Sequence, residues 1–378
     1  MFPWRTPCSP AFKPRFIGPF TLRFHGCHRQ GTFLRSHEQA PWCRPALKIS
    51  EEIAYAPGRR EHMNVQQTHG LTIGPLAASG FGATVAGLAP GAITTAQKEI
   101  VLEAYRRHHG LLCFEFEGLL SADDLHALTA IFGDNEFAPG LINGIGKKAA
   151  DGEENISVDD QVAALRDKGR DPYLAFIGNV DPDSLKMTPT DRKFYGEWEW
   201  HTDMSYIPVP PTFSLLHARI VPATGGDTGF CSQVLAAAAL PDDLRREVST
   251  LRIKHDATYT SSGVLRPGMS APASPIEAHG HAHPVLRATP SGPALFLGRR
   301  TNAYVVGLPL DESEDLLNRL WAHATQEAFQ YHHHWRVGQV VAWDNRMMLH
   351  MRHPVDETAA RFMWRTQTKG EAVRAVTA

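Results

Sequence analysis

The stretch QVVAWDNRMMLH, residues 339–350, is the most informative about the fold class of this chain. Its first five residues are mostly branched or aromatic and follow a glycine, which is typical of a short buried β-strand. Similar stretches cover residues 212–220, 294–297 and 361–368. Because long insertions separate these strands, the sequence predicts a closed or sandwiched β core rather than a parallel α/β sheet.

Helical patterns lie mostly at the start and in the late middle of the chain. Thr94 and Gln97 form a capping box for a helix that ends at Gly110. A second helix is expected over residues 121–132, and the leucine-rich residues 316–324 indicate another. We therefore expect a mainly β protein with flanking helices, an α+β arrangement.

Composition limits the class of protein. The 378 residues include 38 basic and 40 acidic side chains, so no net field favours nucleic acid or an anionic membrane as a partner. No apolar run approaches the roughly 18 residues that a membrane span needs. The chain has five cysteines, and an odd number argues against a complete disulfide framework. We therefore expect a reducing compartment and a cytoplasmic protein. The sequence leaves a homo-oligomeric state open.

Two segments have no clear place in this core. Residues 1–62 form an extension that we expect to be disordered, or that results from a mis-called start upstream of Met63. Residues 63–378 form the expected domain. Within it, residues 147–168 are charged and contain glycine, which favours a mobile surface loop that is either simply solvated or a substrate lid.

A histidine and an aspartate two residues apart begin the informative region. If this stretch is a strand, His201 and Asp203 share one face, so an imidazole and a carboxylate could reach one metal ion. The distal partner is His350, which follows a predicted turn at residues 343–346. Two histidines and one carboxylate form a facial triad that suits iron(II) and leaves three positions open. A tetrahedral site with a bound water would instead suit zinc and hydrolysis.

Two arginines follow the distal histidine. Arg361 lies eleven residues after His350, and Arg365 lies four residues further on. If this segment is a strand, Arg361, Met363 and Arg365 share one face. A guanidinium group binds a carboxylate through two hydrogen bonds, so one arginine could hold the distal carboxylate of 2-oxoglutarate and the other an acidic substrate.

Several motifs follow one another along the chain: His201-Thr202-Asp203, Pro210-Pro211, Gly225-Gly226-Asp227-Thr228, Trp343-Asp344-Asn345-Arg346 with His350, and the segment from Arg361 to Arg365. Over about residues 71–369 these motifs resemble the taurine dioxygenase and 2,4-dichlorophenoxyacetate dioxygenase (TauD/TfdA) family of iron and 2-oxoglutarate-dependent enzymes. The fold that this resemblance implies is a double-stranded β-helix, or jelly roll.

The resemblance also implies roles for individual residues. By this resemblance, Fe(II) would be bound by His201, Asp203 and His350, 2-oxoglutarate by Thr228 and Arg361, and the substrate anion by Arg365. The implied reaction converts 2-oxoglutarate and O₂ into succinate and CO₂ and hydroxylates a small anionic substrate, such as a sulfonate, an aryloxyalkanoate or a sulfate ester. Hydroxylation next to an ether oxygen or a sulfonate sulfur would lead to bond cleavage.

Two other classes of protein could use the same three side chains. A zinc-dependent hydrolase would work without oxygen and release no succinate, and a metal-stabilised β-barrel binding protein would show no turnover. The pair of Arg361 and Arg365 argues against both classes, because neither requires two inward-facing cations after the distal histidine.

Overall fold

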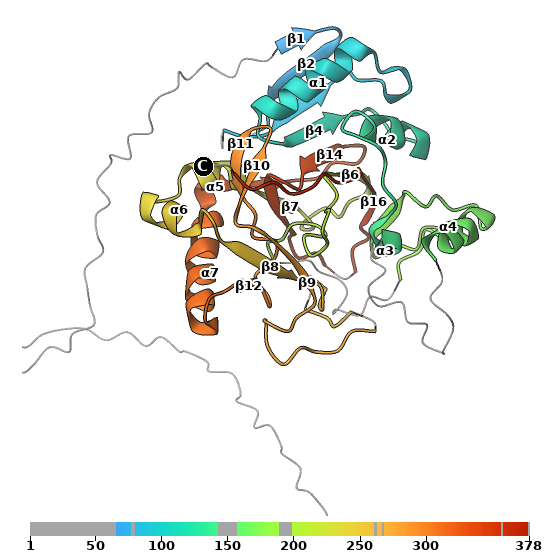
Figure 1. Cartoon of the computed structure of the whole chain (residues 1–378). Coiled ribbons are helices and arrows are strands. Elements are labelled where there is room, and N and C mark those ends of the chain that lie inside the picture. Colours follow the sequence, from blue (N-terminus) through green and yellow to red (C-terminus); the bar gives the residue numbers. More distant parts are fainter. Residues whose placement is uncertain are drawn as a thin grey trace, which may run out of the picture. The chain divides into compact units, whose positions relative to one another are not determined.

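The computed structural model describes residues 66–76, 80–142, 157–188, 199–260, 263–266, 268–356 and 358–376. The expected extension over residues 1–62 lies outside this part of the chain. Within it, sheets make up the larger share of the regular structure, and helices flank them (Figure 1). The sequence prediction of a mainly β protein with flanking helices is confirmed at this level.

The largest sheet has eight strands and contains one parallel pair, β3 with β4. In sheet order its strands are β1 (Gln66–Thr68), β2 (Leu71–Pro75), β3 (Ala83–Ala86), β4 (Leu111–Glu115), β14 (Val340–Asp344), β6 (Phe213–Ile220), β16 (Phe362–Gln367) and β5 (Ala175–Gly178). The strands predicted at residues 212–220, 339–343 and 361–368 correspond to β6, β14 and β16.

Three smaller sheets accompany the large one. In sheet order they contain β13 (Gln330–His333), β7 (Thr228–Ser232) and β15 (Met348–Arg352); then β12 (Tyr304–Val305), β8 (Arg252–Asp256) and β9 (Gly280–Pro284); and finally β10 (Leu286–Thr289) with β11 (Gly292–Leu295). The strand predicted at residues 294–297 overlaps β11. The first of these sheets, β13-β7-β15, carries His350 and matters most for the site.

The described helices are η1 (Pro90–Ala92), α1 (Thr95–Arg107), α2 (Ala122–Thr129), α3 (Pro139–Ile142), α4 (Val158–Asp167), α5 (Gln233–Ala238), α6 (Asp242–Val248), α7 (Leu310–Ala324) and η3 (Glu327–Phe329). Three of them agree with the sequence prediction. Thr94 and Gln97 form the predicted capping box of α1, and the helices predicted at residues 121–132 and 316–324 are α2 and α7. None of the helices described here is long and apolar enough to cross a membrane.

The prediction of a surface loop over residues 147–168 is wrong for its second half, which forms α4. The hydroxyl of Ser157 caps this helix by accepting from the Asp160 N–H at 3.1 Å. Of the α4 side chains only Val162 is buried. The charged composition of residues 158–167 therefore reflects a solvated helix rather than an irregular loop. Residues 147–156 lie outside the described part of the chain.

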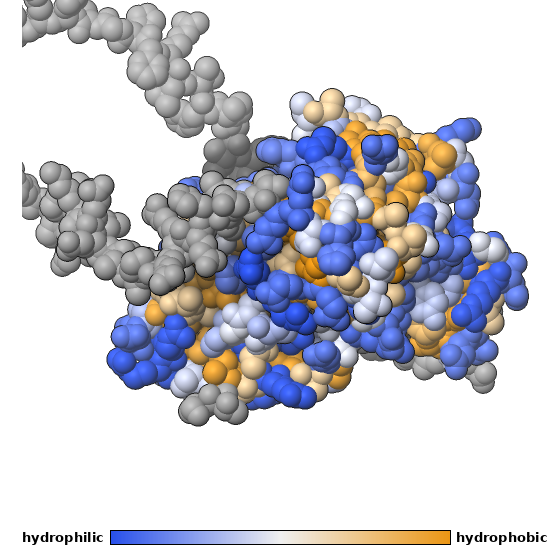
Figure 2. Space-filling model, turned by 90° about the horizontal axis from the view of Figure 1, so that it is seen from above, coloured by the Kyte–Doolittle hydropathy of each residue, from blue (hydrophilic) through white to orange (hydrophobic). Residues whose placement is uncertain are grey.

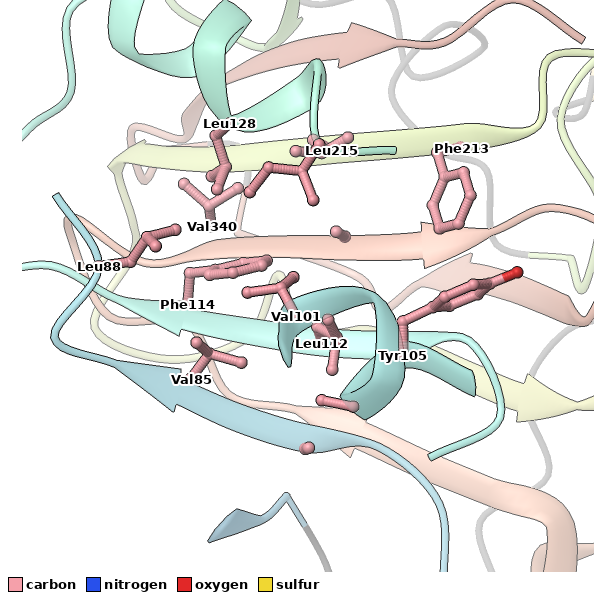
Figure 3. Packing of buried hydrophobic residues seen from close by; sticks show 14 of the residues in the cluster. Val85, Leu88, Val101, Tyr105, Leu112, Phe114, Leu128, Phe213, Leu215 and Val340 are labelled. Atoms are coloured by element: carbon pink, nitrogen blue, oxygen red, sulfur yellow. The ribbon is translucent and has the colours of Figure 1, made fainter. Parts of the chain in front are cut away.

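Alternation along the strands divides the side chains of the large sheet between two hydrophobic cores. In β14, Val340 and Ala342 face a core that includes residues of α1 and α2, which Figure 3 shows. Val341 and Trp343 face a second core, which also contains Phe230 of β7. One strand thus contributes to both sides of the sheet.

The second core lies between the large sheet and the β13-β7-β15 sheet. Its buried residues include Leu216 and Ala218 of β6, Phe230 of β7 and Met348 of β15. Burial of a large apolar side chain contributes about 1.5–3 kcal/mol. This layer therefore holds β15, and with it His350, against the large sheet.

On the outer surface, the face seen in Figure 2 has hydrophilic residues interspersed with apolar ones.

A buried histidine of the large sheet makes stability depend on pH. The Leu120 N–H donates to Nε2 of His217 at 3.1 Å, and Nδ1 of His217 donates to the Gln339 carbonyl at 3.2 Å. Burial lowers the pKa of His217 from 6.5 to about 4. Between these two values the unfolded chain takes up a proton that the folded chain does not, so stability falls as the pH is lowered through this window.

We predict that lowering the pH from 7 to 5 reduces the free energy of unfolding by roughly 2 kcal/mol more in the unaltered protein than in His217→Gln. Urea unfolding followed by circular dichroism at the two pH values measures this difference. His279→Gln, at an exposed histidine, is the control and should keep the pH dependence of the unaltered protein. Equal losses in the unaltered protein and His217→Gln would contradict the prediction.

Candidate active site

Three side chains with metal-binding atoms come together in the structure. One ligand atom from each of His201, Asp203 and His350 lies within 4.8 Å of the other two, and all three residues are buried. Among the described residues this is the only group of three or more histidine, cysteine or acidic side chains that could hold a metal ion. The centroids of the two imidazole rings are 4.3 Å apart, and Nε2 of His350 lies 3.6 Å from Oδ1 of Asp203.

Backbone pairing holds the two histidines side by side. His350 lies in β15, where it pairs with Phe230 of β7. His201 exchanges two backbone hydrogen bonds with His350, at 2.8 and 3.0 Å. Residues that face each other in an antiparallel pair carry their side chains on the same face. Both rings therefore leave the same face of the sheet.

The strand expected at residues 201–203 does not have that form. His201 is an isolated bridge residue, and Asp203 lies in a turn. Between them, the N–H of Thr202 donates to the Gly298 carbonyl at 2.8 Å. The carboxylate is thus brought to the histidines by a turn that follows a short backbone bridge, and not by alternation along a strand.

A hydrogen bond fixes the tautomer of His201. Its Nδ1 atom lies 2.8 Å from the carbonyl oxygen of Glu199. Because a carbonyl oxygen only accepts, Nδ1 carries the proton and Nε2 carries the lone pair. Metal-binding histidines are commonly oriented by such a bond from the second ring nitrogen. His201 therefore has the tautomer that a ligand bonding through Nε2 requires.

The two oxygens of Asp203 have different surroundings. Oδ2 accepts a hydrogen bond from Oγ of Ser214 at 2.9 Å and lies 2.7 Å from Nη2 of Arg365. Oδ1 is the oxygen that faces His350. The carboxylate is therefore oriented with one oxygen held by protein donors and the other directed toward the histidines.

Sequence analysis did not single out Ser214. This fully buried residue lies on the face of β6 that also carries Leu216 and Ala218, which belong to the core between the sheets. The alternation of β6 was predictable, but nothing local indicates that this face meets Asp203. That contact arises only from the tertiary structure.

The hydroxyl of Ser214 makes all the hydrogen bonds available to it. It donates to Asp203 and accepts from Nδ2 of Asn345 at 3.0 Å and from Nη2 of Arg365 at 3.1 Å. Asn345 is itself oriented, because its Oδ1 accepts from Nε1 of Trp343 at 3.0 Å. A continuous line of hydrogen bonds thus runs from the end of β14 to the candidate ligand.

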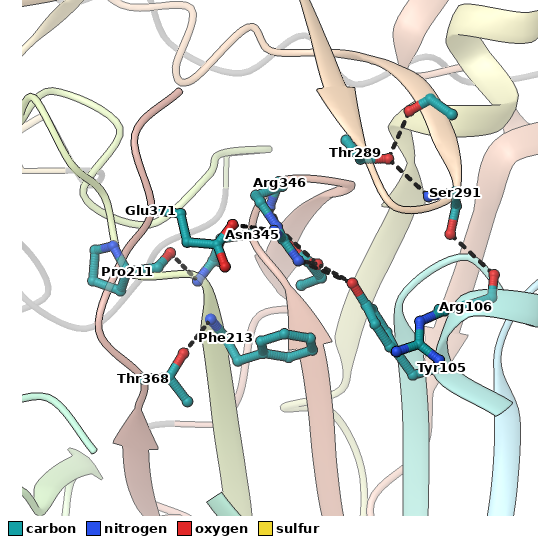
Figure 4. Close-up of polar contacts among 12 residues, drawn as sticks. Tyr105, Arg106, Pro211, Phe213, Thr289, Ser291, Asn345, Arg346, Thr368 and Glu371 are labelled. Atoms are coloured by element: carbon teal, nitrogen blue, oxygen red, sulfur yellow. Dashed lines mark hydrogen bonds and ion pairs between the residues drawn. The ribbon is translucent and has the colours of Figure 1, made fainter. Parts of the chain in front are cut away.

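The turn that precedes His350 is stabilised by a buried ion pair. Asp344 is fully buried, and its Oδ2 lies 2.7 Å from Nη2 of Arg346 and accepts from the hydroxyl of Tyr105 at 2.9 Å. Nη1 of Arg346 reaches Glu371 at 2.9 Å, and Figure 4 shows Glu371 and Tyr105 on either side of the arginine. Burial, with the charge of Asp344, raises the pKa of Tyr105, so its hydroxyl stays protonated.

The two residues predicted to bind 2-oxoglutarate lie at the same glycine-rich turn. Nε of the buried Arg361 donates to the Gly226 carbonyl at 3.2 Å, and Thr228 begins β7 two residues later. Oγ1 of Thr228 accepts from Nε1 of Trp335 at 3.0 Å. Gly226 has a φ of 71° and a Cβ there would lie 3.2 Å from Cδ of Arg361, so glycine permits this close approach. A cavity of about 310 Å³, lined mainly by residues 221–227, opens at the turn.

Strand register relates this turn to the candidate metal ligands. In the β7–β15 pair, Phe230 lies opposite His350 and Thr228 lies opposite Arg352. Residues two apart in a strand leave the same face, separated by roughly 7 Å. The side chain of Thr228 is therefore on the same face as the ring of His350, a short distance along the strands.

Arg361 and Arg365 both belong to the segment that contains β16. Arg361 directly precedes this strand, and its carbonyl accepts from the Asn179 N–H at 3.0 Å, so the pairing of β16 with β5 extends to Arg361. Arg361 and Arg365 therefore leave the same face. Arg365 contacts Asp203 and Ser214 through Nη2. Its predicted contact with a substrate anion stays a prediction.

The donor set of two imidazoles and one carboxylate oxygen fits an ion that accepts further ligands. This set suits iron(II) with open coordination positions, and it also suits zinc with a bound water.

Comparisons with known proteins identify relatives. The model of the family described as taurine catabolism dioxygenase TauD, TfdA family matches residues 72–367. The (S)-phenoxypropionate/alpha-ketoglutarate-dioxygenase of Sphingobium herbicidovorans is 32% identical over 235 residues, which cover 58% of this chain and 80% of that protein. The alpha-ketoglutarate-dependent 2,4-dichlorophenoxyacetate dioxygenase of Cupriavidus pinatubonensis is 36% identical over 210 residues, which cover 53% of this chain and 71% of that protein. A solved structure of AAD-2 in complex with Mn(II) and N-oxalylglycine is 25% identical, with a TM-score of 0.62, and the match covers 82% of this chain and 99% of that one.

We predict that Ser214→Ala weakens the binding of Mn(II) about tenfold, because the carboxylate of Asp203 loses a donor that orients it. Isothermal titration calorimetry on the purified protein measures the affinity. Thr366→Val is the matched control, since this buried hydroxyl of β16 contacts Thr129 instead. Equal Mn(II) affinities in Ser214→Ala and Thr366→Val would contradict the prediction.

Proposed function

Because the chain belongs to the taurine catabolism dioxygenase TauD, TfdA family, we propose that it is an Fe(II)- and 2-oxoglutarate-dependent dioxygenase that hydroxylates a small anionic organic substrate. One oxygen atom of O₂ enters the succinate formed from 2-oxoglutarate, and the other enters the substrate as a hydroxyl group, with release of CO₂. The observation that carries the proposal is the meeting of His201, Asp203 and His350 in one buried cluster.

Residues 63–378 are, in this proposal, the dioxygenase domain, and the match of the family model over residues 72–367 supports this boundary. The large sheet and the β13-β7-β15 sheet, packed through a shared core, are proposed to be the two halves of a double-stranded β-helix, or jelly roll. From the cysteine content and the balanced charge we further propose a cytoplasmic location.

His201 and His350 would bind Fe(II) through nitrogen, and Asp203 through Oδ1. The tautomer of His201 and the orientation of Asp203 support this assignment. Bound there, iron(II) supplies open coordination positions for the 2-oxo acid and for O₂. Membership of the family favours this interpretation over a zinc-dependent hydrolase or a non-catalytic binding protein.

Thr228 and Arg361 would hold the distal carboxylate of 2-oxoglutarate. A buried guanidinium gives a strong charge-assisted contact to a carboxylate, and the hydroxyl of Thr228 can add a further donor. Because Thr228 leaves the same face as His350, a short dicarboxylic acid could reach from the turn to the metal ligands. These residues would orient the cosubstrate and keep water from its carboxylate.

The proposed substrates are aryloxyalkanoates, sulfonates or sulfate esters, whose acidic group would contact Arg365. Two relatives are named for phenoxypropionate and 2,4-dichlorophenoxyacetate, which supports an anionic substrate. Hydroxylation of a carbon that carries an ether oxygen would give a product that breaks at that bond. Release of a phenol together with succinate would then be the observable result.

We predict that the purified protein binds one Fe(II) and consumes 2-oxoglutarate only in the presence of O₂, and that His201→Ala or Asp203→Ala abolishes both properties. Each change removes one of three ligands. Calorimetric titration with Fe(II) under argon and a succinate assay under air measure the two properties. His279→Ala, which removes an exposed histidine, should behave as the unaltered protein. Full turnover by either ligand variant would exclude the facial triad.

Arg361→Ala should weaken 2-oxoglutarate binding by at least about tenfold, because loss of a shielded, charge-assisted contact costs on the order of 2–5 kcal/mol. The affinity for Fe(II) should not change. Calorimetric titration of the metal-loaded protein with 2-oxoglutarate under argon tests this. Arg319→Ala, at an exposed arginine that pairs with Glu247, is the control. An unchanged affinity for 2-oxoglutarate would move the cosubstrate site elsewhere.

A further inference from the structure

A third backbone segment lies next to the candidate metal ligands. His201 forms antiparallel bridges on both sides, to His350 and to Arg299. The N–H of Thr202 donates to the Gly298 carbonyl at 2.8 Å. This bond joins the residues next to His201 and Arg299, so His201 and Arg299 themselves form a non-hydrogen-bonded antiparallel pair. In such pairs the Cα atoms are only about 4.5 Å apart and the side chains are close. Arg299 therefore leaves the same face as His201 and His350, one strand further along.

Gly298 makes this approach possible. It has a φ of 68°, and a Cβ at this position would lie 2.1 Å from Nδ1 of His255. Only glycine can adopt this conformation here without displacing the buried imidazole. The backbone can therefore pass over His255 and place the next residue, Arg299, against His201.

The guanidinium of Arg299 is held close to a second one. Arg299 is 7% exposed, and its Nη1 donates to the carbonyl of Tyr259 at 2.9 Å. Nε of Arg266 donates to the same carbonyl at 3.2 Å. The guanidinium of Arg266 also lies over the ring of Tyr206, 4.7 Å from its centroid. The two guanidinium groups thus meet at one carbonyl oxygen, and Arg299 also lies beside His201 in the backbone pairing.

An apolar cluster adjoins Arg266. Met204 and Tyr206, directly after the His-x-Asp motif, form a small buried cluster with Ala257, which follows β8, and Ile207 packs against this cluster. A cationic pair beside an aromatic and a thioether side chain suits a ligand with an acidic group on an apolar body. An aryloxyalkanoate has this combination.

The neighbouring arginine provides a contrast. Arg300 is directed toward α7, where its guanidinium forms an ion pair with Glu314 and donates to Oδ1 of Asn318 at 2.8 Å. Arg300 therefore supports the packing of a helix, whereas Arg299 is on the face of the metal ligands.

We infer that Arg299, with Arg266 beside it, binds the carboxylate or sulfonate group of the substrate and selects anionic over neutral substrates. This inference rests on the proposed oxygenase function. It adds a second cationic contact to that of Arg365, which lies at Asp203. The acidic group would lie on the His201 side of the metal ligands, and its apolar body against Tyr206.

The test uses the full-length, Fe(II)-loaded enzyme with 2-phenoxypropionate, 2,4-dichlorophenoxyacetate, an alkanesulfonate and an alkyl sulfate, and with neutral 2-phenoxypropanamide. For the best acid, Arg299→Gln should raise KM at least about tenfold and leave kcat and the affinity for 2-oxoglutarate within about twofold. The KM of Arg299→Lys should lie between those of the unaltered enzyme and Arg299→Gln, because lysine keeps the charge and loses the planar guanidinium. Arg266→Gln should also raise KM, but by a smaller factor than Arg299→Gln. Arg300→Gln is the matched control and should leave KM unchanged.

An unchanged KM in Arg299→Gln would overturn the inference, as would equal use of 2-phenoxypropionate and its amide by the unaltered enzyme. If Arg299→Gln melts far below the unaltered protein, the same criterion applies to Arg299→Lys and Arg266→Gln. An unaltered enzyme that consumes 2-oxoglutarate with O₂ but takes none of the four acids would contradict the anion site alone. An enzyme that consumes no 2-oxoglutarate under any condition would contradict the proposed function itself.

Discussion

The carboxylate of Asp203 is held from one side: Ser214 and Arg365 bind its Oδ2 atom, while its Oδ1 atom faces His350. A carboxylate at a buried position is costly unless it is paired and hydrogen-bonded, so these contacts allow it to remain there. They also fix which oxygen faces the histidines. The candidate metal centre therefore depends on groups that do not themselves belong to the ligand set.

Three adjacent strands of the large sheet supply those groups. Asn345 follows β14, Ser214 lies in β6 and Arg365 lies in β16, and these strands are neighbours in the sheet. The facing sheet supplies His350 from β15 and Thr228 from β7. The hydrophobic core between the two sheets sets their separation, and thus the distance between the held carboxylate and the histidines. Packing, and not only the motif, makes the site.

Sequence patterns indicated the features that depend on neighbouring residues. The strand at β14 was predictable from its own composition, whereas the three side chains of the candidate metal site were named from the His-x-Asp motif taken together with His350 and with the resemblance to a known family. The helix α4 was missed, because its charged, glycine-flanked sequence resembles a loop. The contacts of Ser214 and the position of Arg299 were also missed, since both come from which backbone segment lies beside Asp203 or His201. Such register between distant segments leaves no local signal.

Anomalous diffraction from a crystal of the full-length protein grown with Mn(II) would test the proposed metal centre without reference to turnover, because it locates the metal itself. We expect one metal ion bonded to Nε2 of His201, Nε2 of His350 and Oδ1 of Asp203, with Oδ2 still hydrogen-bonded to Ser214. A metal ion bound away from these three residues would contradict this expectation. So would a metal ion bound by both oxygens of Asp203, with the hydroxyl of Ser214 no longer donating to the carboxylate.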